Sequence, residues 1–224
     1  MWLELDVHHH LGHGAQAFTL DVKVQLSAPR AVVLGPSGAG KSLLLKAIAG
    51  LLRPNHGHIR LAGRTLFDGA QGIALPPQAR RVGYVFQDYA LLPHLTVRQN
   101  IAFGLTRGWR NPPRSAHQPA VAHWLAAMQL ETRADHYPHQ LSGGQRQRTA
   151  LARALATEPA ALLLDEPFAA LDAPLRAQMR IELAALQQRL AVPMLLISHD
   201  PDDAQAFGDC VLRLDGGRLV EAIA

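Results

Sequence analysis

The sequence predicts an α/β fold that is interrupted by a helical insertion. Short runs at residues 31–34, 161–164 and 194–197 are apolar throughout, as in central parallel strands that are covered on both faces. Between Tyr89 and Pro159 the composition changes to that of helices. With 224 residues, 48% of them apolar, the chain can bury a sizeable core. We therefore predict an α/β lobe at residues 1–88 and 158–224 and a helical subdomain at residues 89–157, which together form one domain.

Apolar runs and alternating apolar residues predict the individual strands. They are expected at Leu3–Val7, Phe18–Leu26, Ala31–Leu34, His58–Leu61, Val82–Phe86, Ala161–Leu164, Pro193–Ile197, Cys210–Leu214 and Leu219–Glu221. Asp215-Gly216-Gly217 predicts a tight hairpin between the last two. Helices are expected at Leu43–Ile48, Ala120–Leu130, Gly144–Thr157 and Pro174–Leu190. The proline-rich stretch Arg107–Pro119 is expected to be a mobile loop.

Residues 35–42 form a glycine-rich phosphate loop, because Gly-Pro-Ser-Gly-Ala-Gly-Lys-Ser fills every fixed position of GxxxxGK[ST]. Closely spaced glycines let successive N–H groups turn towards one anion, and the following helix directs its positive end at the same phosphates. Lys41 is expected to reach the β- and γ-phosphates, and the Ser42 hydroxyl to ligate Mg²⁺. The predicted nucleotide-binding residues here are Gly35, Pro36, Ser37, Gly38, Ala39, Gly40, Lys41, Ser42 and Leu43.

Two adjacent acids, Asp165 and Glu166, end the apolar run at residues 161–164. A buried parallel strand that ends in acids places them at the carboxyl edge of the sheet, where the phosphate loop is also expected. Asp165 is suited to hold Mg²⁺ through its water shell. Glu166 lies one residue further and points differently, towards the position of an attacking water.

The pentapeptide Leu141-Ser142-Gly143-Gly144-Gln145 precedes a predicted helix. Ser142 is a favourable helix cap, and the glycines leave N–H groups exposed, so the motif predicts a second anion site. One such site per nucleotide is usually enough. A second site in the insertion therefore needs an explanation.

A family resemblance supplies one. With the phosphate loop, Gln87, residues 141–145, Asp165-Glu166, Asp172 and His199 in this order, the chain resembles an ATP-binding cassette ATPase from end to end. The resemblance implies a P-loop NTPase core, with a mostly parallel sheet and an antiparallel β subdomain. It also implies a head-to-tail homodimer that encloses two ATP molecules. Each γ-phosphate would touch one subunit's phosphate loop and the other subunit's Ser142, Gly143 and Gly144, in the motif that Gln145 completes.

The same resemblance implies roles for residues outside these motifs. Gln87 matches the glutamine that contacts Mg²⁺ or water and senses the membrane partner. His199 matches the histidine that steadies the γ-phosphate, and Asp172 lies in the loop that bridges the dimer. The expected catalytic residues are Glu166, His199, Lys41 and Gln87, and the expected metal ligands are Ser42, Gln87 and Asp165.

Two positions depart from the family pattern. Ala169 stands where the dimer-bridging loop usually carries serine, so one cross-interface hydrogen bond is expected to be absent. Many members stack adenine on an aromatic residue upstream of the phosphate loop, but here that neighbourhood is Leu11-Gly12-His13. Either His10 or His13 stacks on the base, or adenine is held loosely. Phe18 is expected to be a core residue because it sits in an alternating strand.

Residues 75–97 are similar to bacterial importers of anions and metals, and residues 72–88 with the N-terminal strands resemble most the molybdate importer's ATPase subunit. Such subunits generally carry a further C-terminal oxyanion-binding domain. That domain is expected to be absent, because the sequence stops at Ala224, so the chain is either naturally short or only the ATPase part. The implied partners are two integral-membrane permease subunits, bound near residues 87–95, and indirectly a periplasmic or extracellular binding protein. The implied location is the cytoplasmic face of the inner (plasma) membrane, as a peripheral subunit.

Alternatives to this function are other importer substrates (sulfate, phosphate, iron or polyamine), an exporter, or a soluble cassette that acts on nucleic acid or ribosomes. DNA-repair cassettes carry long coiled coils or zinc insertions, and translation cassettes are fused in pairs. This sequence has one cassette and one cysteine, so no nucleic-acid partner is expected. The formal charge of +4 is not concentrated in runs and does not by itself argue for nucleic acid. A phosphate-loop kinase would leave residues 141–145 unexplained.

Composition also predicts the compartment. The longest aliphatic run, Ala160–Leu164, is too short to cross a bilayer, and the N-terminus lacks a secretory pattern, so the protein is expected in the cytosol. Cys210 is expected to be a buried strand thiol. The adjacent His8–His10 should point in different directions, which argues against a metal site.

Overall fold

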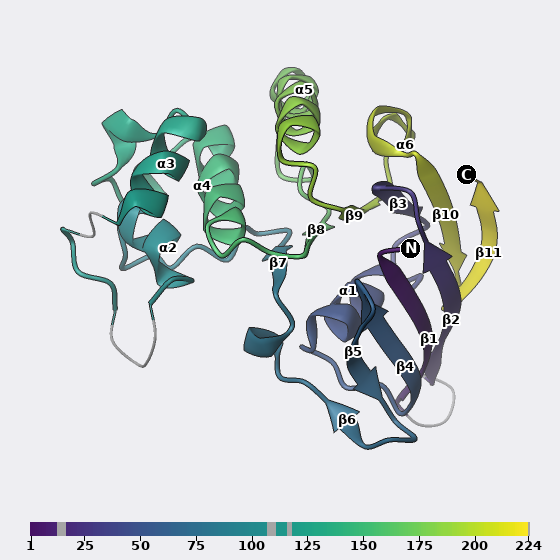
Figure 1. Cartoon of the computed structure of the whole chain (residues 1–224). Coiled ribbons are helices and arrows are strands. Elements are labelled where there is room, and N and C mark those ends of the chain that lie inside the picture. The colour runs from purple at the N-terminus through teal and green to yellow at the C-terminus, as the bar shows by residue number, and fades with distance from the viewer. Residues whose placement is uncertain (13–16, 107–110, 116–117, 224) are drawn as a thin grey trace.

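The computed structural model describes residues 1–12, 17–106, 111–115 and 118–223 (Figure 1). Within them, eleven strands form one mixed sheet in the order β6-β5-β4-β1-β2-β11-β10-β3-β9-β8-β7. The strands are β1 (Leu3–Leu11), β2 (Phe18–Leu26), β3 (Arg30–Leu34), β4 (His56–Leu61), β5 (Arg64–Asp68), β6 (Ile73–Ala74), β7 (Val82–Val85), β8 (Ala161–Asp165), β9 (Met194–Ser198), β10 (Cys210–Asp215) and β11 (Arg218–Ile223). The helices are α1 (Lys41–Ala49), α2 (Val97–Phe103), α3 (Pro119–Ala127), α4 (Gly143–Leu155), α5 (Ala173–Leu190) and α6 (Pro201–Phe207), with 3₁₀ turns η2 (Pro77–Ala79), η3 (Glu131–Arg133) and η4 (Pro138–Gln140).

The parallel half of the sheet consists of β10, β3, β9, β8 and β7. Every residue of β8 and β9 is buried, as is the centre of β3. The prediction that the apolar runs at 31–34, 161–164 and 194–197 are central parallel strands is therefore confirmed. Because these strands run in the same direction, the loops that follow β3, β7, β8 and β9 all leave from one edge of the sheet.

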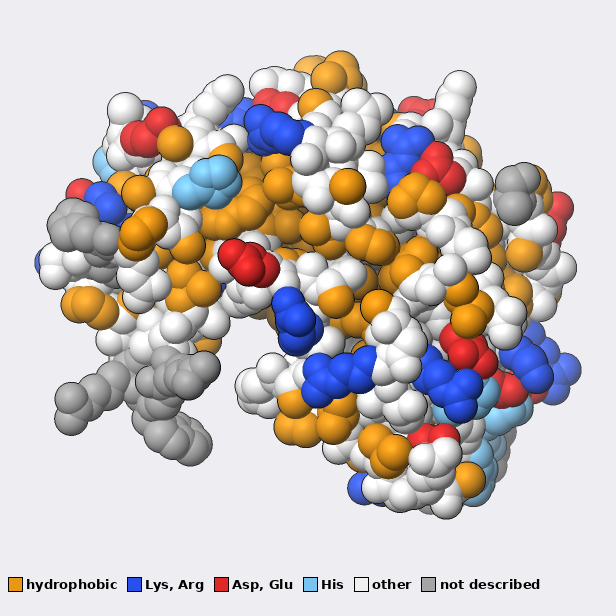
Figure 2. Space-filling model, viewed as in Figure 1, with side chains coloured by type: hydrophobic (Ala, Val, Ile, Leu, Met, Phe, Trp, Pro, Cys, Tyr) orange, Lys and Arg blue, Asp and Glu red, His pale blue; other side chains and the backbone are white. Residues whose placement is uncertain are grey.

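The antiparallel half consists of β1, β2, β4, β5 and β6. It joins the parallel half where β2 meets β11 at the pair Asp21–Arg218. Side chains alternate along β1, so His8 and His10 are exposed and His9 is buried, as strand geometry requires. Histidine side chains, in pale blue, show at the lower right of the molecule and separately at its upper left (Figure 2).

The helices α2, α3 and α4 lie together at one side of the molecule, with α5 between them and the region of β10 and β11 (Figure 1). Their apolar faces share a core with β7, β8 and β9 that includes Val85, Leu151 and Met194. A second core lies on the other face of the sheet, between the strands and α1, and includes Leu45, Val33 and Leu5. Among the described residues, no helix has both the length and the apolar character of a membrane span.

Two strands and two α-helices were not predicted, namely β5, β6, α2 and α6. β5 and β6 are short strands at the edge of the antiparallel half. α2 begins at a capping box in which the Thr96 side chain accepts a hydrogen bond from the Gln99 amide and Gln99 reaches back to the Thr96 amide. α6 begins at Pro201 and is capped by Asp200, the residue before it.

Some helices begin or end at residues other than those predicted, where the backbone leaves helical geometry. The helix expected at Ala120–Leu130 begins at Pro119 and ends at Ala127, because Gln129 adopts a left-handed backbone with φ 55°. The helix expected at Gly144–Thr157 spans Gly143–Leu155. In the expected loop Arg107–Pro119, residues 107–110 and 116–117 lie outside the described residues. Residues 111–115 form neither helix nor strand.

Candidate functional site

The phosphate loop joins the end of β3 to the start of α1. Gly38 and Gly40 adopt φ values of 81° and 96°, which other residues rarely reach. A Cβ on Gly35 would lie 2.1 Å from the Leu214 carbonyl oxygen, so this position requires glycine for close approach. No side chain caps α1 and its first turn has no acidic residue. Its first N–H groups are therefore available to an anion.

Lys41 closes this loop. Its ammonium donates hydrogen bonds to the carbonyl oxygens of Gly35 (2.7 Å) and Pro36 (2.9 Å). The side chain is 5% exposed and its Nζ lies 4.0 Å from Oε1 of Glu166. An ammonium has three donors, and the two carbonyls use two of them. The third is left for a group that enters the space between the loop and Glu166.

Asp165 links the phosphate loop to two neighbouring strands. Its Oδ1 accepts a hydrogen bond of 2.8 Å from Ser42 Oγ, and its Oδ2 accepts one of 2.9 Å from the Tyr84 hydroxyl. Burial, with the negative charge of Asp165, raises the pKa of Tyr84, which therefore remains a proton donor. Ser42 and Asp165, both predicted as metal ligands, thus lie together, and their oxygen donors are of the kind that Mg²⁺ prefers.

Tyr84 was not predicted as a site residue. β7 was expected to be a strand, but nothing in its sequence indicates which side chain lies across β8 from the phosphate loop. The pairing of Tyr84 with Leu163 brings the phenol beside the acid that ends β8. The ring also contacts Phe86, with centroids 4.3 Å apart, which holds the hydroxyl in position.

Glu166 stands between two predicted catalytic residues. Its Oε2 is 3.2 Å from Nδ1 of His199, and its Oε1 is the atom that faces Lys41. Its backbone is left-handed, with φ 46°, a strained conformation for a non-glycine residue that is enriched at functional sites. His199 follows β9 and is 56% exposed. The carboxylate therefore has one neighbour buried in the protein and one open to solvent.

A cleft of about 300 Å³ lies beside Lys41 and Glu166. It is lined by Gln87, Glu166 and residues 37–43 of the phosphate loop and α1. Gly35 and Pro36 instead line a hollow on the other side of the loop, with Leu214 and Pro201. The loops that follow β3, β7 and β8 thus meet in one cleft. Because this cleft is open to solvent, a ligand bound in it would be fully enclosed only by a second surface.

The motif at residues 141–145 does not line this cleft. Ser142 caps α4 by accepting a hydrogen bond from the Gln145 amide, and Gln145 Oε1 accepts one from the Ser142 amide. A Cβ on Gly143 would meet Leu171 at 3.0 Å, and one on Gly144 would meet Leu175 at 3.3 Å. α4 and α1 lie in different parts of the molecule (Figure 1). The two predicted anion sites of one chain are therefore separate.

The loop at residues 169–172, which the resemblance predicts to bridge a dimer, packs against the motif. Asp172 caps α5, accepting a hydrogen bond of 2.9 Å from the Leu175 amide. Leu171, one residue before it, is the side chain against which Gly143 packs. The structure thus brings residues 141–145 and the loop at 169–172 together, and leaves both outside the phosphate cleft.

The residues considered for adenine lie in three different settings. His13 lies outside the described residues. His10 is exposed, and its Nδ1 is 2.8 Å from the Thr19 hydroxyl. Phe18 is partly buried, packs against the core of the lobe as expected, and borders the phosphate loop, since its ring lies 2.8 Å from where a Cβ on Gly40 would be.

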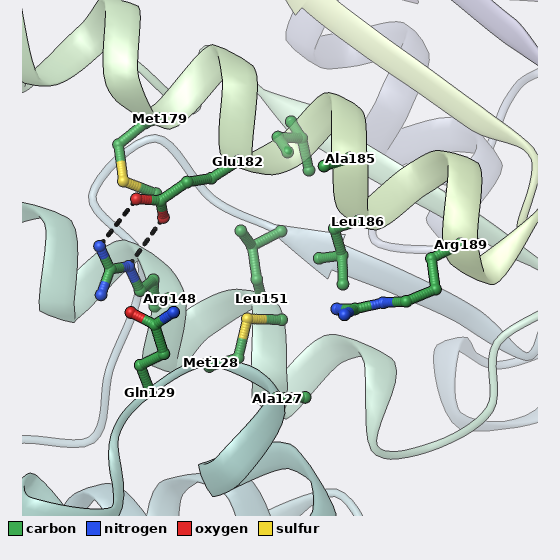
Figure 3. A pocket seen from close by; sticks show the side chains of 11 residues that line it. Ala127, Met128, Gln129, Arg148, Leu151, Met179, Glu182, Ala185, Leu186 and Arg189 are labelled. Atoms are coloured by element: carbon green, nitrogen blue, oxygen red, sulfur yellow. Dashed lines mark hydrogen bonds and ion pairs between the residues drawn. The ribbon is translucent and has the colours of Figure 1, made fainter.

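A second cavity, of about 240 Å³, lies between α3, α4 and α5 (Figure 3). Its apolar wall includes Met128, Leu151 and Leu186. Arg148 of α4 and Glu182 of α5 form a bidentate ion pair at its rim, with both N–O distances 2.9 Å. None of the residues predicted for nucleotide binding or catalysis lines this cavity.

Comparison with known proteins gives matches along the whole chain. A family model described as "ABC transporter" matches residues 20–169. The probable sulfate/thiosulfate import ATP-binding protein of Chlorella vulgaris is 47% identical over 84% of this chain and 77% of that protein. The Fe(3+) ions import ATP-binding protein of Pseudomonas fluorescens is 46% identical over 97% of this chain and 60% of that protein. The molybdenum import ATP-binding protein of Paramagnetospirillum magneticum is 39% identical over 97% of this chain and 58% of that protein. This chain therefore spans only part of the length of these relatives.

Two solved structures are similar over nearly the whole fold. The dimeric structure of MJ0796, a bacterial ABC transporter cassette, superposes with a TM-score of 0.81 at 28% identity and covers 99% of this chain and 97% of that chain. A dimeric post-hydrolysis state of the same cassette, bound to ADP and Pi, superposes with a TM-score of 0.79.

Proposed function

The chain belongs to the ABC transporter family, and on that premise we propose that it is the ATP-hydrolysing subunit of an importer. The observation that carries the proposal is the position of Glu166 at the edge of the cleft, between the Lys41 ammonium and the His199 ring. A carboxylate held beside a phosphate loop in this way can accept the proton of a water that attacks the γ-phosphate.

Other residues in and around the cleft have further proposed roles. The phosphate-loop amides and α1 bind the β- and γ-phosphates, and the unused donor of Lys41, together with His199, stabilises the charge that develops on the γ-phosphate. Ser42, Asp165 and Gln87 would hold Mg²⁺, which when bound neutralises phosphate charge. The Tyr84 hydroxyl orients the Asp165 carboxylate, since it donates to the oxygen that Ser42 does not contact.

The proposed test is Glu166→Gln, which keeps the size of the side chain and removes the base. We expect unchanged nucleotide binding and a fall in ATP turnover of roughly 100-fold or more. Glu182→Gln on α5, away from the cleft, is the matched control and should turn over normally. Near-normal hydrolysis by the Glu166→Gln protein would refute the role of Glu166.

The proposed active assembly is a head-to-tail homodimer. Its support is the separation of residues 141–145 from the phosphate cleft of the same chain, together with the dimeric state named for the MJ0796 structures. In that arrangement Ser142, Gly143 and Gly144 of each subunit complete the partner's cleft. We expect the Glu166→Gln protein to become dimeric in solution scattering when Mg²⁺ and ATP are added. A protein that remained monomeric under nucleotide saturation would refute this assembly.

The proposed permease-docking surface follows Gln87, at residues 89–95. Tyr89 and Leu95 are buried, so they serve packing, whereas Leu91 and Leu92 are only partly buried. Leu92 is thus the residue most available to a membrane partner, and Leu91, which also packs against the helical core, offers its remaining surface. Changing both to glutamate should abolish co-purification with the permease subunits and preserve basal ATP hydrolysis. Retained co-purification would exclude these leucines from the docking surface.

The proposed cargo is an oxyanion, with molybdate as the specific hypothesis from the resemblance of residues 72–88. Relatives named for sulfate, iron, molybdenum and spermidine/putrescine import are 39–48% identical to this chain, so sequence identity does not single out one cargo. The test is uptake by the complete transporter, measured separately with radiolabelled molybdate, sulfate, iron and spermidine. Transport of polyamine or iron in place of both anions would refute the oxyanion proposal.

A further inference from the structure

A partly buried ionic network adjoins the backbone on both sides of His199. Arg180 of α5 donates hydrogen bonds of 2.6 Å to Asp200 and 2.6 Å to Asp203, at the start of α6. Asp203 in turn accepts a hydrogen bond of 2.5 Å from the Ser198 hydroxyl, and that hydroxyl accepts one of 2.9 Å from the Asp200 amide. The residues on both sides of His199 are therefore held by side chains that the catalytic proposal does not use.

Arg176 connects this network to the dimer-bridging loop, residues 169–172. One guanidinium nitrogen donates to the Leu171 carbonyl oxygen (3.2 Å) and another to Oδ2 of Asp200 (3.2 Å). Leu171 precedes Asp172, and Asp200 follows His199. A single planar group, which is rigid compared with a lysine side chain, thus joins the bridging loop to the residue next to the histidine.

A small cavity beside this connection shows that the two segments are contiguous. It has a volume of about 10 Å³, close to the space that one water needs, and its lining includes Glu166, Ala169, Arg176 and His199. The buried Nε of Arg176 has no hydrogen-bond partner among the described residues. The Arg176 guanidinium therefore has one unused N–H donor near residues 169–172 and Glu166.

We propose that Arg176 is a positioning residue that couples the bridging loop to His199. A partner subunit that engages residues 169–172 moves the Leu171 carbonyl. The guanidinium transmits this shift to Asp200 and so to the histidine beside Glu166. This inference rests on the proposed ATPase and its dimer, but it concerns a residue that contacts neither nucleotide nor partner in that proposal.

A double-mutant cycle tests the coupling. We expect Arg176→Ala to lower kcat roughly 10-fold with KM for ATP changed less than about twofold, because the phosphate loop is untouched. In a His199→Ala background the same change should alter kcat by less than about twofold, since Arg176 acts through the histidine. Arg176→Lys should recover little, because an ammonium cannot reproduce the two-pronged contact. Arg30→Ala is the matched control: it removes an Arg–Asp pair of comparable exposure at the other end of β3 and should leave kcat unchanged.

Turnover in the His199→Ala background is a possible obstacle, because it is useful only if it is high enough to compare. A second measurement therefore follows hydrogen exchange of the Glu166→Gln protein with and without MgATP. With Arg176 present, MgATP should protect both residues 169–172 and residues 198–200. In Arg176→Ala it should protect only the bridging loop. Independent, multiplicative effects of the two substitutions, or equal protection of both segments without Arg176, would overturn the proposal. A wild-type protein without ATPase activity would instead overturn the proposed function, so the two failures are distinguishable.

Discussion

The hydrogen bond from Tyr84 to Asp165 can be tested by removing a single oxygen. In Tyr84→Phe the ring contact with Phe86 is kept, and only the donor to Asp165 Oδ2 is lost. A hydrogen bond to a charged group contributes about 1.5–3 kcal/mol, and Asp165 is only 6% exposed, so water cannot freely replace the phenol. We therefore expect the free energy of unfolding of the nucleotide-free protein to fall by about 1.5–3 kcal/mol at pH 7.

The assay is equilibrium urea unfolding, with Tyr137→Phe as the matched control. The Tyr137 hydroxyl pairs with Arg114 at an exposed position, so its loss should cost less than about 0.5 kcal/mol. A Tyr84→Phe protein within about 0.5 kcal/mol of that control would refute the reasoning that this bond orders Asp165, the acid proposed to hold Mg²⁺.

A pH series tests the same bond independently. The pKa of Tyr84 is raised in the folded protein, whereas tyrosine in the unfolded chain ionises near pH 10. Above about pH 10 the unfolded state therefore binds fewer protons than the folded state, and the stability of the wild type falls as pH rises. The Tyr84→Phe variant has no phenol at this position, so it does not undergo this fall in stability. The stability difference between the two proteins should accordingly narrow above pH 10, and a constant difference would contradict the shifted pKa.

Two further predictions concern packing. Leu183 is 1% exposed in the core between α4 and α5, so Leu183→Ala should lower the free energy of unfolding, measured by urea titration, by about 2–5 kcal/mol. The control is Ile181→Ala on the same helix. Because Ile181 is 72% exposed, this change should lower the free energy of unfolding by less than about 0.5 kcal/mol. Arg153 of α4 donates hydrogen bonds of 2.7 Å to the carbonyl oxygens of Tyr89 and Ala90, both of which have a left-handed backbone. Arg153→Ala should cost about 1–3 kcal/mol and should raise amide exchange at residues 87–92 more than elsewhere; unchanged exchange there would show that the strained segment does not depend on this residue.

Residues that follow buried parallel strands could be placed from the sequence. The apolar runs at 31–34, 161–164 and 194–197 predict neighbouring strands, and Lys41, Glu166 and His199 each lie just beyond one of them. Because parallel strands end at the same edge, the loops after them had to converge, and the distances from Glu166 to Lys41 and His199 agree with that expectation. The catalytic roles of these residues remain predictions.

Residues that act across elements could not be placed in this way. Tyr84 reaches Asp165 from a neighbouring strand, and Arg176 reaches Asp200 from a helix 24 positions earlier in the chain. Both partners are ordinary polar residues within their own segments, with no local spacing that connects them. The start of α2 is a different case, because Thr96 and Gln99 carry the spacing of a capping box, and that signal was available in the sequence.

Sequence patterns alone were enough to predict the phosphate loop, the acids after the buried strand and the capped start of α4, because each of these depends on hydrogen bonds and backbone angles within a few consecutive residues. By contrast, the three-dimensional arrangement was needed to show that residues 141–145 pack against Leu171 and Leu175 and lie outside the cleft formed by their own chain's phosphate loop. That outcome depends on how the helices pack against the sheet, and such packing is set by the shapes of side chains far apart in the chain.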